Sequence, residues 1–323
     1  MLRVRDAIET KDDLFFSVVS YHHPGDRYIA FLRYYPSPKG ERMRKGKSYL
    51  KVESTEMSYD FLNSQYPHHI FYSHATDSRL QCVPMDKVKA IFYPYRRLKE
   101  ICDEPRDMLE RTAVEISDLF GEIPLEKKGV TGSLLLGFHK PESDVDFVFY
   151  GRKNFEKARE ILAEGSSIAR PLTKEEWQAA YRKRIRDAST ISFDEFLRHE
   201  RRKHHKAAVG RVLFDILFVR DRDEIRGKYS DLSFRRTGRF TGRLKVLDAS
   251  LAFDYPAVYK VTGEDEDIRE VASYTHTYVG QAEEGEEIEV SGALEEITGG
   301  DHYKRIVIGT TREALGEYIR VIK

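Results

Sequence analysis

Three aspartates set among apolar residues are the side chains in this sequence best suited to chemistry. Asp144 and Asp146 open the apolar run 145–150, and Asp215 lies inside a second apolar run at 210–219. Residues i and i+2 of a strand point to the same face, so the first two carboxylates lie side by side. Such a pair repels unless a cation lies between the two groups or one of them is protonated. Carboxylate oxygens suit Mg²⁺ or Mn²⁺, which predicts a metal site here.

A neighbouring strand would bring Asp215 to the same edge of the sheet. The three carboxylates would then hold two metal ions about 3.5–4 Å apart, one activating an attacking hydroxyl and the other neutralising a leaving pyrophosphate. Without such a role, an aspartate between Phe214 and Ile216 would be buried with no partner, which is costly. The aspartates therefore predict metal-dependent transfer of a phosphorus-containing group.

The Gly132-Ser133 pair precedes the first two aspartates and has the composition of a phosphate-binding turn. Glycine lets the backbone approach closely, and the amides that begin the following short helix point toward an anion. The Ser133 hydroxyl would donate to a phosphate oxygen. Ser143, just before Asp144, is either a cap or a further nucleotide contact.

The Asp-x-Asp pattern alone is weak, because it also occurs at 221–223 and 265–267 in charged, loop-like segments. Only Asp144 and Asp146 follow a Gly-Ser pair, lie next to strand-like sequence, and have a later strand carboxylate. The combination is what carries the prediction.

With this combination the sequence resembles the DNA polymerase beta-type nucleotidyltransferase superfamily over 104–225, and the whole chain is similar to archaeal predicted nucleotidyltransferases. The resemblance implies a short mixed sheet with helices and a Mg²⁺- or Mn²⁺-dependent transfer of a nucleoside monophosphate from an NTP such as ATP. It implies that Gly132 and Ser133 hold the triphosphate, Asp144 and Asp146 bind both metals, and Asp215 binds the catalytic metal. The long segment between Asp146 and Asp215 would be a lid or an acceptor-binding element, unless Asp215 is the wrong third carboxylate.

The helices and strands expected from the rest of the sequence indicate an α+β chain of three domains. Aromatic and β-branched runs at 14–21 and 28–35 indicate a β-rich N-terminal domain over 1–103, with a short helix at 56–63 and an extended segment at 83–95. The polymerase beta-like core follows over 104–232, with helices at 104–121, 154–164, 174–187 and 193–208. Five short strands after residue 257, separated by glycines, predict a small C-terminal barrel or sandwich over 233–323, for which an OB-like barrel is one arrangement.

The 54 Lys+Arg balance the 54 Asp+Glu, which excludes a uniformly basic surface. The chemical class of the acceptor must therefore be inferred from local basic stretches. One basic stretch covers 198–206, a second covers 235–245 without acids of its own, and a third at 39–51 is interleaved with tyrosines. The residues we expect to contact phosphate or nucleic acid are Arg201, Arg202, Lys203, Arg235 and Arg236. These stretches favour a nucleic-acid acceptor, with RNA preferred. The alternatives are solvated helix faces, an inactive core that only binds nucleic acid, or a protein or small-molecule acceptor.

The sequence predicts no disulfide, no zinc site, no membrane-spanning helix and no signal sequence. Two cysteines exclude a disulfide framework and a four-cysteine zinc site. His68-His69 and the other histidines have no cysteine or carboxylate at ligand spacing, so we expect no zinc site. No apolar run approaches the ~20 residues of a membrane-spanning helix, and the charged N-terminus lacks a signal sequence. A cytoplasmic protein with no membrane partner is expected.

Overall fold

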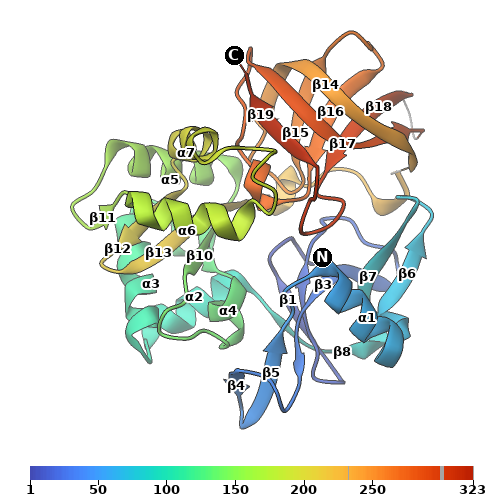
Figure 1. Cartoon of the computed structure of the whole chain (residues 1–323). Coiled ribbons are helices and arrows are strands. Elements are labelled where there is room, and N and C mark those ends of the chain that lie inside the picture. Colours follow the sequence, from blue (N-terminus) through green and yellow to red (C-terminus); the bar gives the residue numbers. More distant parts are fainter. Residues whose placement is uncertain (232, 299–301, 323) are drawn as a thin grey trace. The chain divides into compact units, whose positions relative to one another are not determined.

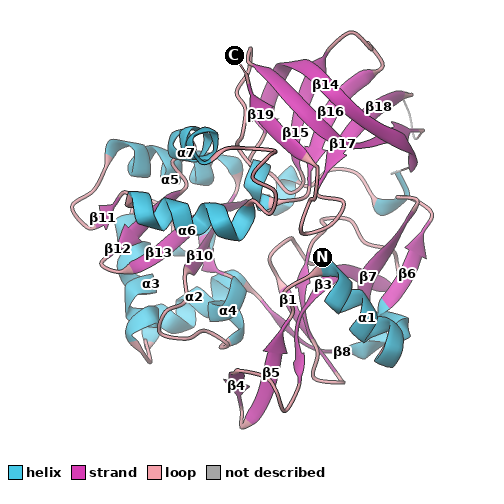
Figure 2. Ribbon diagram, viewed as in Figure 1, coloured by secondary structure: helices cyan, strands magenta, loops and turns pink. Residues whose placement is uncertain are grey.

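The computed structural model describes residues 1–231, 233–298 and 302–322 (Figure 1). Its contacts group into two compact units. Unit 1 comprises 1–71, 80–172 and 204–226, and unit 2 comprises 72–79, 173–203 and 227–323. The α+β class is confirmed by the mixture of helices and sheets (Figure 2). The three-domain division stays a prediction, and its second boundary, at residue 232, lies outside the described residues.

The N-terminal region forms an eight-stranded sheet in the order β4-β5-β3-β2-β1-β8, with β7 pairing to β3 and to β6. Its strands are β1 (Ala7–Thr10), β2 (Phe15–Val18), β3 (Arg27–Pro36), β4 (Arg42–Arg44), β5 (Lys47–Lys51), β6 (Ile70–Ser73), β7 (Ser78–Pro84) and β8 (Val88–Phe92). Helix α1 (Thr55–Gln65) confirms the helix expected at 56–63 and is capped by the Ser54 side chain. The short 3₁₀ helices of the chain are Pro67–His69, Met85–Lys87, Leu125–Lys127, Arg222–Glu224, Tyr229–Asp231 and His276–Tyr278.

The second sheet of unit 1 is mixed and has the order β11-β12-β13-β10-β9. Its strands are β9 (Lys128–Val130), β10 (Val145–Tyr150), β11 (Ala169–Arg170), β12 (Lys206–Val209) and β13 (Val212–Val219), and only the β10–β13 pair is parallel. The helices of this region are α2 (Pro94–Asp103), α3 (Met108–Leu119), α4 (Gly132–Leu136) and α5 (Arg152–Glu164).

Two helix predictions in this region were wrong in their boundaries. Pro94, expected in an extended segment, begins α2, because proline suits the first helical position. The helix expected from residue 104 begins instead at Met108, where the Asp107 side chain accepts the Glu110 N–H at 2.9 Å.

An aromatic cluster joins α4 to the N-terminal sheet. Phe138 stacks on Tyr34, with ring centroids 4.3 Å apart, and contacts Phe15 and Tyr49 edge-on. Tyr34 and Tyr49 are buried in this cluster, so they offer no free face for base stacking. Their role is to hold the segment that begins with Gly132.

The C-terminal region of unit 2 contains β14 (Phe234–Leu251), β15 (Ala257–Thr262), β16 (Ile268–Ser273), β17 (Glu287–Ile297), β18 (Tyr303–Ile308) and β19 (Tyr318–Val321). The order is β14-β15-β16-β18-β17-β19. The long strand β14 pairs with both β15 and β17, so these pairings close on themselves. The five strands expected after residue 257 are confirmed, and β14 is an additional strand.

Helices α6 (Lys174–Arg184) and α7 (Phe193–Arg202) also belong to unit 2. His199 accepts the Val321 N–H at its Nε2 atom, 3.3 Å away, and Arg202 pairs with Glu286. The helix expected over 193–208 ends at Arg202, since 206–209 forms β12. The long connection between Asp146 and Asp215 thus reflects a helical segment that packs with the C-terminal strands. In the part of the chain that the structure describes, no helix is long and apolar enough to cross a membrane.

Candidate active site

Asp146 and Asp215 lie directly opposite each other on the parallel strands β10 and β13. Each is the single charged residue of its strand, and its neighbours Phe147 and Phe214 are buried. Residues paired in register on neighbouring strands point to the same face of the sheet. The Asp215 side chain keeps 23% of its surface exposed, so this face of the sheet is open to solvent there.

The electrostatics of Asp146 indicate a surplus of negative charge. Burial raises the pKa of its carboxyl above the ordinary value, and the charges of Asp215 and Asp144 raise it further. Arg5 and Arg33, from the N-terminal region, act in the opposite direction and favour the ionised form. A bound cation would offset the remaining negative charge around Asp146.

Gly132 packs against the Asp146 carboxylate so closely that a side chain at position 132 would clash with it. Its φ of +65° lies in the left-handed region, and a Cβ atom there would lie 2.3 Å from Oδ2 of Asp146. The turn is fixed on both sides, because the Thr131 N–H donates to the Asp146 carbonyl at 2.9 Å and the Thr131 hydroxyl donates to the Arg5 carbonyl at 3.0 Å. Since α4 starts at Gly132, the N–H groups of its first turn have no intrahelical partner.

The two serines and the remaining aspartate flank this turn. Ser133 is partly exposed, and its carbonyl accepts the Phe138 N–H at 2.9 Å. The Ser143 hydroxyl accepts the Lys140 N–H at 2.9 Å, so Ser143 closes the turn that leads into exposed Asp144. Ser143 therefore stabilises a turn before strand β10 and does not cap a helix, and a nucleotide contact by Ser143 stays a prediction.

Lys206 faces Asp215 from β12, and its ammonium group contacts the Asp215 carboxylate. The lysine side chain is only 5% exposed, so this ion pair lies on the buried side of Asp215. The sequence placed Lys206 in a basic run but gave no sign of this contact. Arg5 and Arg33 were missed altogether, because no local pattern links them to Asp146.

Within the described residues, the three aspartates are not among the groups whose ligand atoms lie close enough together to hold one metal ion. In the described ranges, the groups whose ligand atoms all lie within 4.8 Å are Asp12, His68 and His69, and Asp107, Glu110 and His139. The aspartates nevertheless fit a hard divalent cation. Their donors are carboxylate oxygens, and burial together with the neighbouring carboxylates raises the pKa of one of them, Asp146.

Aspartates of the two other Asp-x-Asp motifs form ion pairs. Asp221 contacts Lys127 and lies 3.6 Å from Arg3, while Asp265 and Asp267 lie 3.0 Å and 3.6 Å from Lys304. Both motifs therefore have structural partners. Their placement agrees with the choice of Asp144 and Asp146 from the sequence.

The predicted basic contacts on α7 differ in their access to solvent. Arg201 is exposed. Arg202 forms two bonds to Glu286, of 2.5 Å and 2.7 Å. Lys203 is buried, and its ammonium donates to Glu200 at 2.5 Å and to the Thr277 carbonyl at 3.0 Å. The expected phosphate contact is therefore wrong for Lys203, whose charge is used inside unit 2.

The basic stretch on β14 has acidic partners from far along the chain. Arg235 and Arg236 are exposed and lie opposite Glu296 and Glu295 of β17. The same register places Arg243 opposite Glu289 and Lys245 opposite Glu287. Directly opposed residues of an antiparallel pair share a face and interact. The interpretation of this stretch as lacking compensating acids was incomplete, because strand pairing places acids opposite it, although Glu295 and Glu289 also form ion pairs with Arg305 and Arg320.

Comparison with known proteins agrees with the site. Residues 109–202 match the nucleotidyltransferase domain family, a range that includes Gly132, Ser133, Asp144 and Asp146 but ends before Asp215. The chain is 40% identical to the uncharacterized protein MJ1086 of Methanocaldococcus jannaschii over 346 aligned positions, which cover 99% of each chain. No solved structure matches. The chain belongs to the DNA polymerase beta-type nucleotidyltransferase superfamily and shares a family with this archaeal protein.

Proposed function

We propose that the protein transfers a nucleoside monophosphate from an NTP to an acceptor hydroxyl. Asp144, Asp146 and Asp215 would hold Mg²⁺ or Mn²⁺, and Gly132 and Ser133 would hold the triphosphate. The observation that carries the proposal is the juxtaposition of Asp146 with Asp215 on one side and Gly132 on the other.

The order of the strands supports separate positions for the two reactants. Gly132 follows β9, Asp146 lies on β10 and Asp215 lies on β13, in the spatial order β13-β10-β9. The triphosphate would then lie on one side of Asp146 and the acceptor hydroxyl on the other. An in-line displacement of pyrophosphate needs this separation.

The chain's own residues bind and orient the reactants. Bound Mg²⁺ or Mn²⁺ supplies Lewis-acid chemistry that lowers the pKa of the attacking hydroxyl and neutralises the leaving pyrophosphate. The backbone at Gly132 approaches the phosphates, and the Ser133 hydroxyl donates to one of their oxygens. Lys206 holds the Asp215 carboxylate in position. Arg5 adds positive charge beside Asp146.

We further propose a nucleic-acid acceptor, with RNA preferred. Strands β14 to β18 pair in the order β14-β15-β16-β18-β17 and return to β14, with β16 and β18 parallel, which supports an OB-like barrel. OB-like barrels bind single-stranded nucleic acids through stacking and phosphate contacts.

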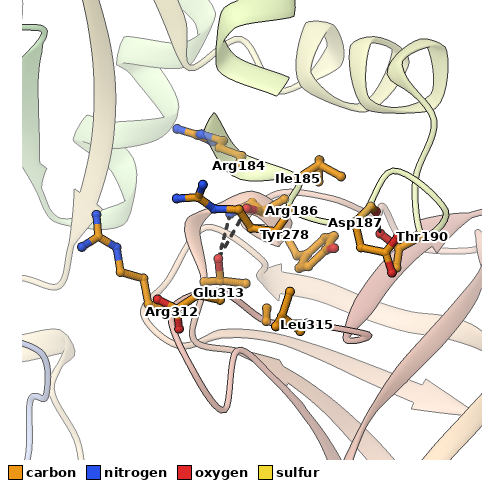
Figure 3. Close-up of a pocket in the computed structure, with 12 residues that line it drawn as sticks. Arg184, Ile185, Arg186, Asp187, Thr190, Tyr278, Arg312, Glu313 and Leu315 are labelled. Carbon is orange, nitrogen blue, oxygen red and sulfur yellow. Dashed lines mark hydrogen bonds between the residues drawn. The ribbon is translucent and has the colours of Figure 1, made fainter. Parts of the chain in front are cut away.

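A pocket in unit 2 adds cationic groups to this proposal. Arg184, Arg186 and Arg312 line it together with Tyr278, Asp187 and Glu313 (Figure 3), and Arg184 also lies 3.6 Å from Glu200. Guanidinium groups bind phosphate oxygens in bidentate fashion. Since Lys203 is buried and the β14 arginines face glutamates, this pocket and Arg201 are the better candidates for phosphate contacts.

Transfer of label from an α-labelled NTP tests the function directly. With Mg²⁺ and RNA, the wild-type chain is expected to label the RNA. Asp144→Asn is expected to reduce the rate by at least about 100-fold, because several kcal/mol of metal-dependent stabilisation is lost. Asp223→Asn, an exposed aspartate of a second Asp-x-Asp motif, is the matched control and should retain activity.

Full activity of Asp144→Asn would overturn the assignment. Label transfer to a protein or small molecule in place of RNA would retain the enzyme and replace the acceptor. RNA binding that leaves every NTP unreacted would favour a binding protein with an inactive core.

A further inference from the structure

Asp12, His68 and His69 converge in the N-terminal region, away from the aspartates of the proposed active site. A carboxylate oxygen of Asp12 and one ring nitrogen from each histidine all lie within 4.8 Å of one another. Asp12 belongs to the turn between β1 and β2, and the histidines end the 3₁₀ helix Pro67–His69. Because the carboxylate is far from the histidines in sequence, the expectation of no zinc site rested on local spacing that does not capture this group.

The orientation of His69 makes one of its nitrogens available to a ligand. The Nδ1 atom lies 2.8 Å from the Cys82 carbonyl oxygen. A carbonyl can only accept, so Nδ1 carries the proton and Nε2 keeps its lone pair. The His69 side chain is 0% exposed, and within the described residues its Nε2 has no hydrogen-bond partner.

A buried lone pair without a partner is costly, and metal coordination is a common way to use it. Histidine ligands of metals typically donate their other ring N–H to a backbone carbonyl, which fixes the tautomer and the orientation of the ring. His69 has this arrangement through Cys82. Packing adds to it, since the His69 ring lies 4.9 Å from the Phe16 ring and 4.4 Å from the His68 ring.

Two nearby lysines pair with the residue next to Asp12. Lys47 and Lys89 both pair with the next residue, Asp13, at 2.6 Å. Asp12 and His68 are exposed, so they can adjust to an incoming ion while His69 stays fixed. One rigid buried ligand and two adaptable ones make a site that an ion can enter from solvent.

We propose that Asp12, His68 and His69 bind a divalent transition metal, with Zn²⁺ the preferred ion. Two imidazole nitrogens and one carboxylate oxygen suit Zn²⁺, whereas Mg²⁺ prefers oxygen ligands alone. Three protein ligands leave a fourth position for water. The bound ion would tie the turn between β1 and β2 to the 3₁₀ helix.

Titration of the metal-free full-length chain with Co²⁺ and Zn²⁺ tests this proposal. We expect one Co²⁺ per chain in the site with nitrogen and oxygen ligands, followed by its four-coordinate visible absorption and displaced by Zn²⁺. An ion held by the three aspartates has oxygen ligands alone and does not contribute this absorption. His68→Ala and Asp12→Asn change exposed residues, so they should fold and bind Co²⁺ at least about 10-fold more weakly. His74→Ala and Asp86→Asn, also exposed, are the matched controls and should bind as the wild type does.

Two further variants separate this site from the other candidates. Asp146→Asn should leave the four-coordinate absorption of Co²⁺ unchanged, because the three-aspartate site would hold an ion by oxygen ligands alone. His139→Ala, in the other histidine-containing group, should also leave it unchanged. Wild-type affinity in both His68→Ala and Asp12→Asn, or loss of the four-coordinate absorption in His139→Ala or Asp146→Asn instead, would overturn the proposal. Failure of nucleotidyl transfer would not affect it.

Discussion

The carboxylate of Asp146 combines three features at the residue scale: partial burial, a facing carboxylate and contact with a glycine. The first two raise its pKa, so the folded chain is strained electrostatically when no cation is bound. Active sites often retain such unfavourable arrangements because the chemistry depends on them. Stability and activity should therefore change in opposite directions when this charge is removed.

Asp146→Asn removes the charge and keeps the shape of the side chain. We expect transfer to fall by at least about 100-fold. The free energy of unfolding in the absence of metal should stay level or rise by about 1 kcal/mol, because the repulsion from Asp215 is relieved. Urea unfolding of both proteins measures this. A clear loss of stability would show that Asp146 has a structural role in place of the proposed one.

Gly132→Ala tests the fit between the turn and Asp146. The added methyl group would occupy the space of Asp146 Oδ2, so we expect the carboxylate to move and transfer to fall sharply. Gly137→Ala is a matched control, because Gly137 has a φ of +69° and open space around it. Both variants should lose roughly 1–2 kcal/mol of stability from left-handed strain, but only Gly132→Ala should lose activity beyond that. Equal activities would contradict a phosphate-binding role for this turn.

At the element scale, helix α7 depends on a neutral histidine. His199 is 1% exposed and accepts the Val321 N–H, so its ring must be unprotonated at Nε2. Burial, followed by the charges of Lys203 and Arg202, lowers the pKa of His199 from 6.5 to about 4. Between these values the unfolded chain binds more protons than the folded chain does. Stability from this residue is therefore complete above pH 6.5 and is lost as the pH falls toward 4.

His199→Gln should remove this part of the acid sensitivity. Glutamine can still accept the Val321 N–H but does not titrate. We expect the loss of unfolding free energy between pH 6.5 and 4 to be smaller by about 3 kcal/mol than in the wild type. His302→Gln, an exposed position in the same unit, should leave the pH profile unchanged. Identical profiles for His199→Gln and the wild type would contradict the assignment.

At the scale of the whole molecule, charge is distributed by strand pairing and not by sequence neighbourhood. The basic run of β14 faces the acidic run of β17 in register. Two of these glutamates also form ion pairs with other arginines, Glu295 with Arg305 and Glu289 with Arg320, so they offset the charge of the β14 cations only in part. The facing glutamates should still reduce the contribution of Arg235 and Arg236 to nucleic-acid affinity, because phosphate binding requires uncompensated cations.

Replacing Arg235 and Arg236 with alanine should change RNA affinity by less than about 2-fold and leave its salt dependence unaltered. Replacing Arg186 and Arg312, which line the pocket in unit 2, should weaken RNA binding and reduce the slope of log affinity against log salt. Binding measured by fluorescence anisotropy at several salt concentrations compares the pairs. A steep loss in the β14 variant would show that the opposing glutamates do not neutralise it.

The sequence predicted the local features of the site well. The strands that carry Asp146 and Asp215, the glycine turn and helix α1 follow from composition and periodicity. The start of helix α2 at Pro94 was not predicted, because proline occurs both in extended segments and at the first position of helices. Lys206, Arg5, Asp12 and the glutamates of β17 could not be placed, since their partners are brought close only by tertiary pairing.

A crystal structure with a nonhydrolysable NTP and Mn²⁺ tests the central claim most directly. We predict anomalous density for Mn²⁺ bound by Asp146 and Asp215, with the triphosphate against the backbone at Gly132 and Ser133. Mn²⁺ and nucleotide bound elsewhere, with Asp215 still paired with Lys206 and no ion beside it, would contradict the account.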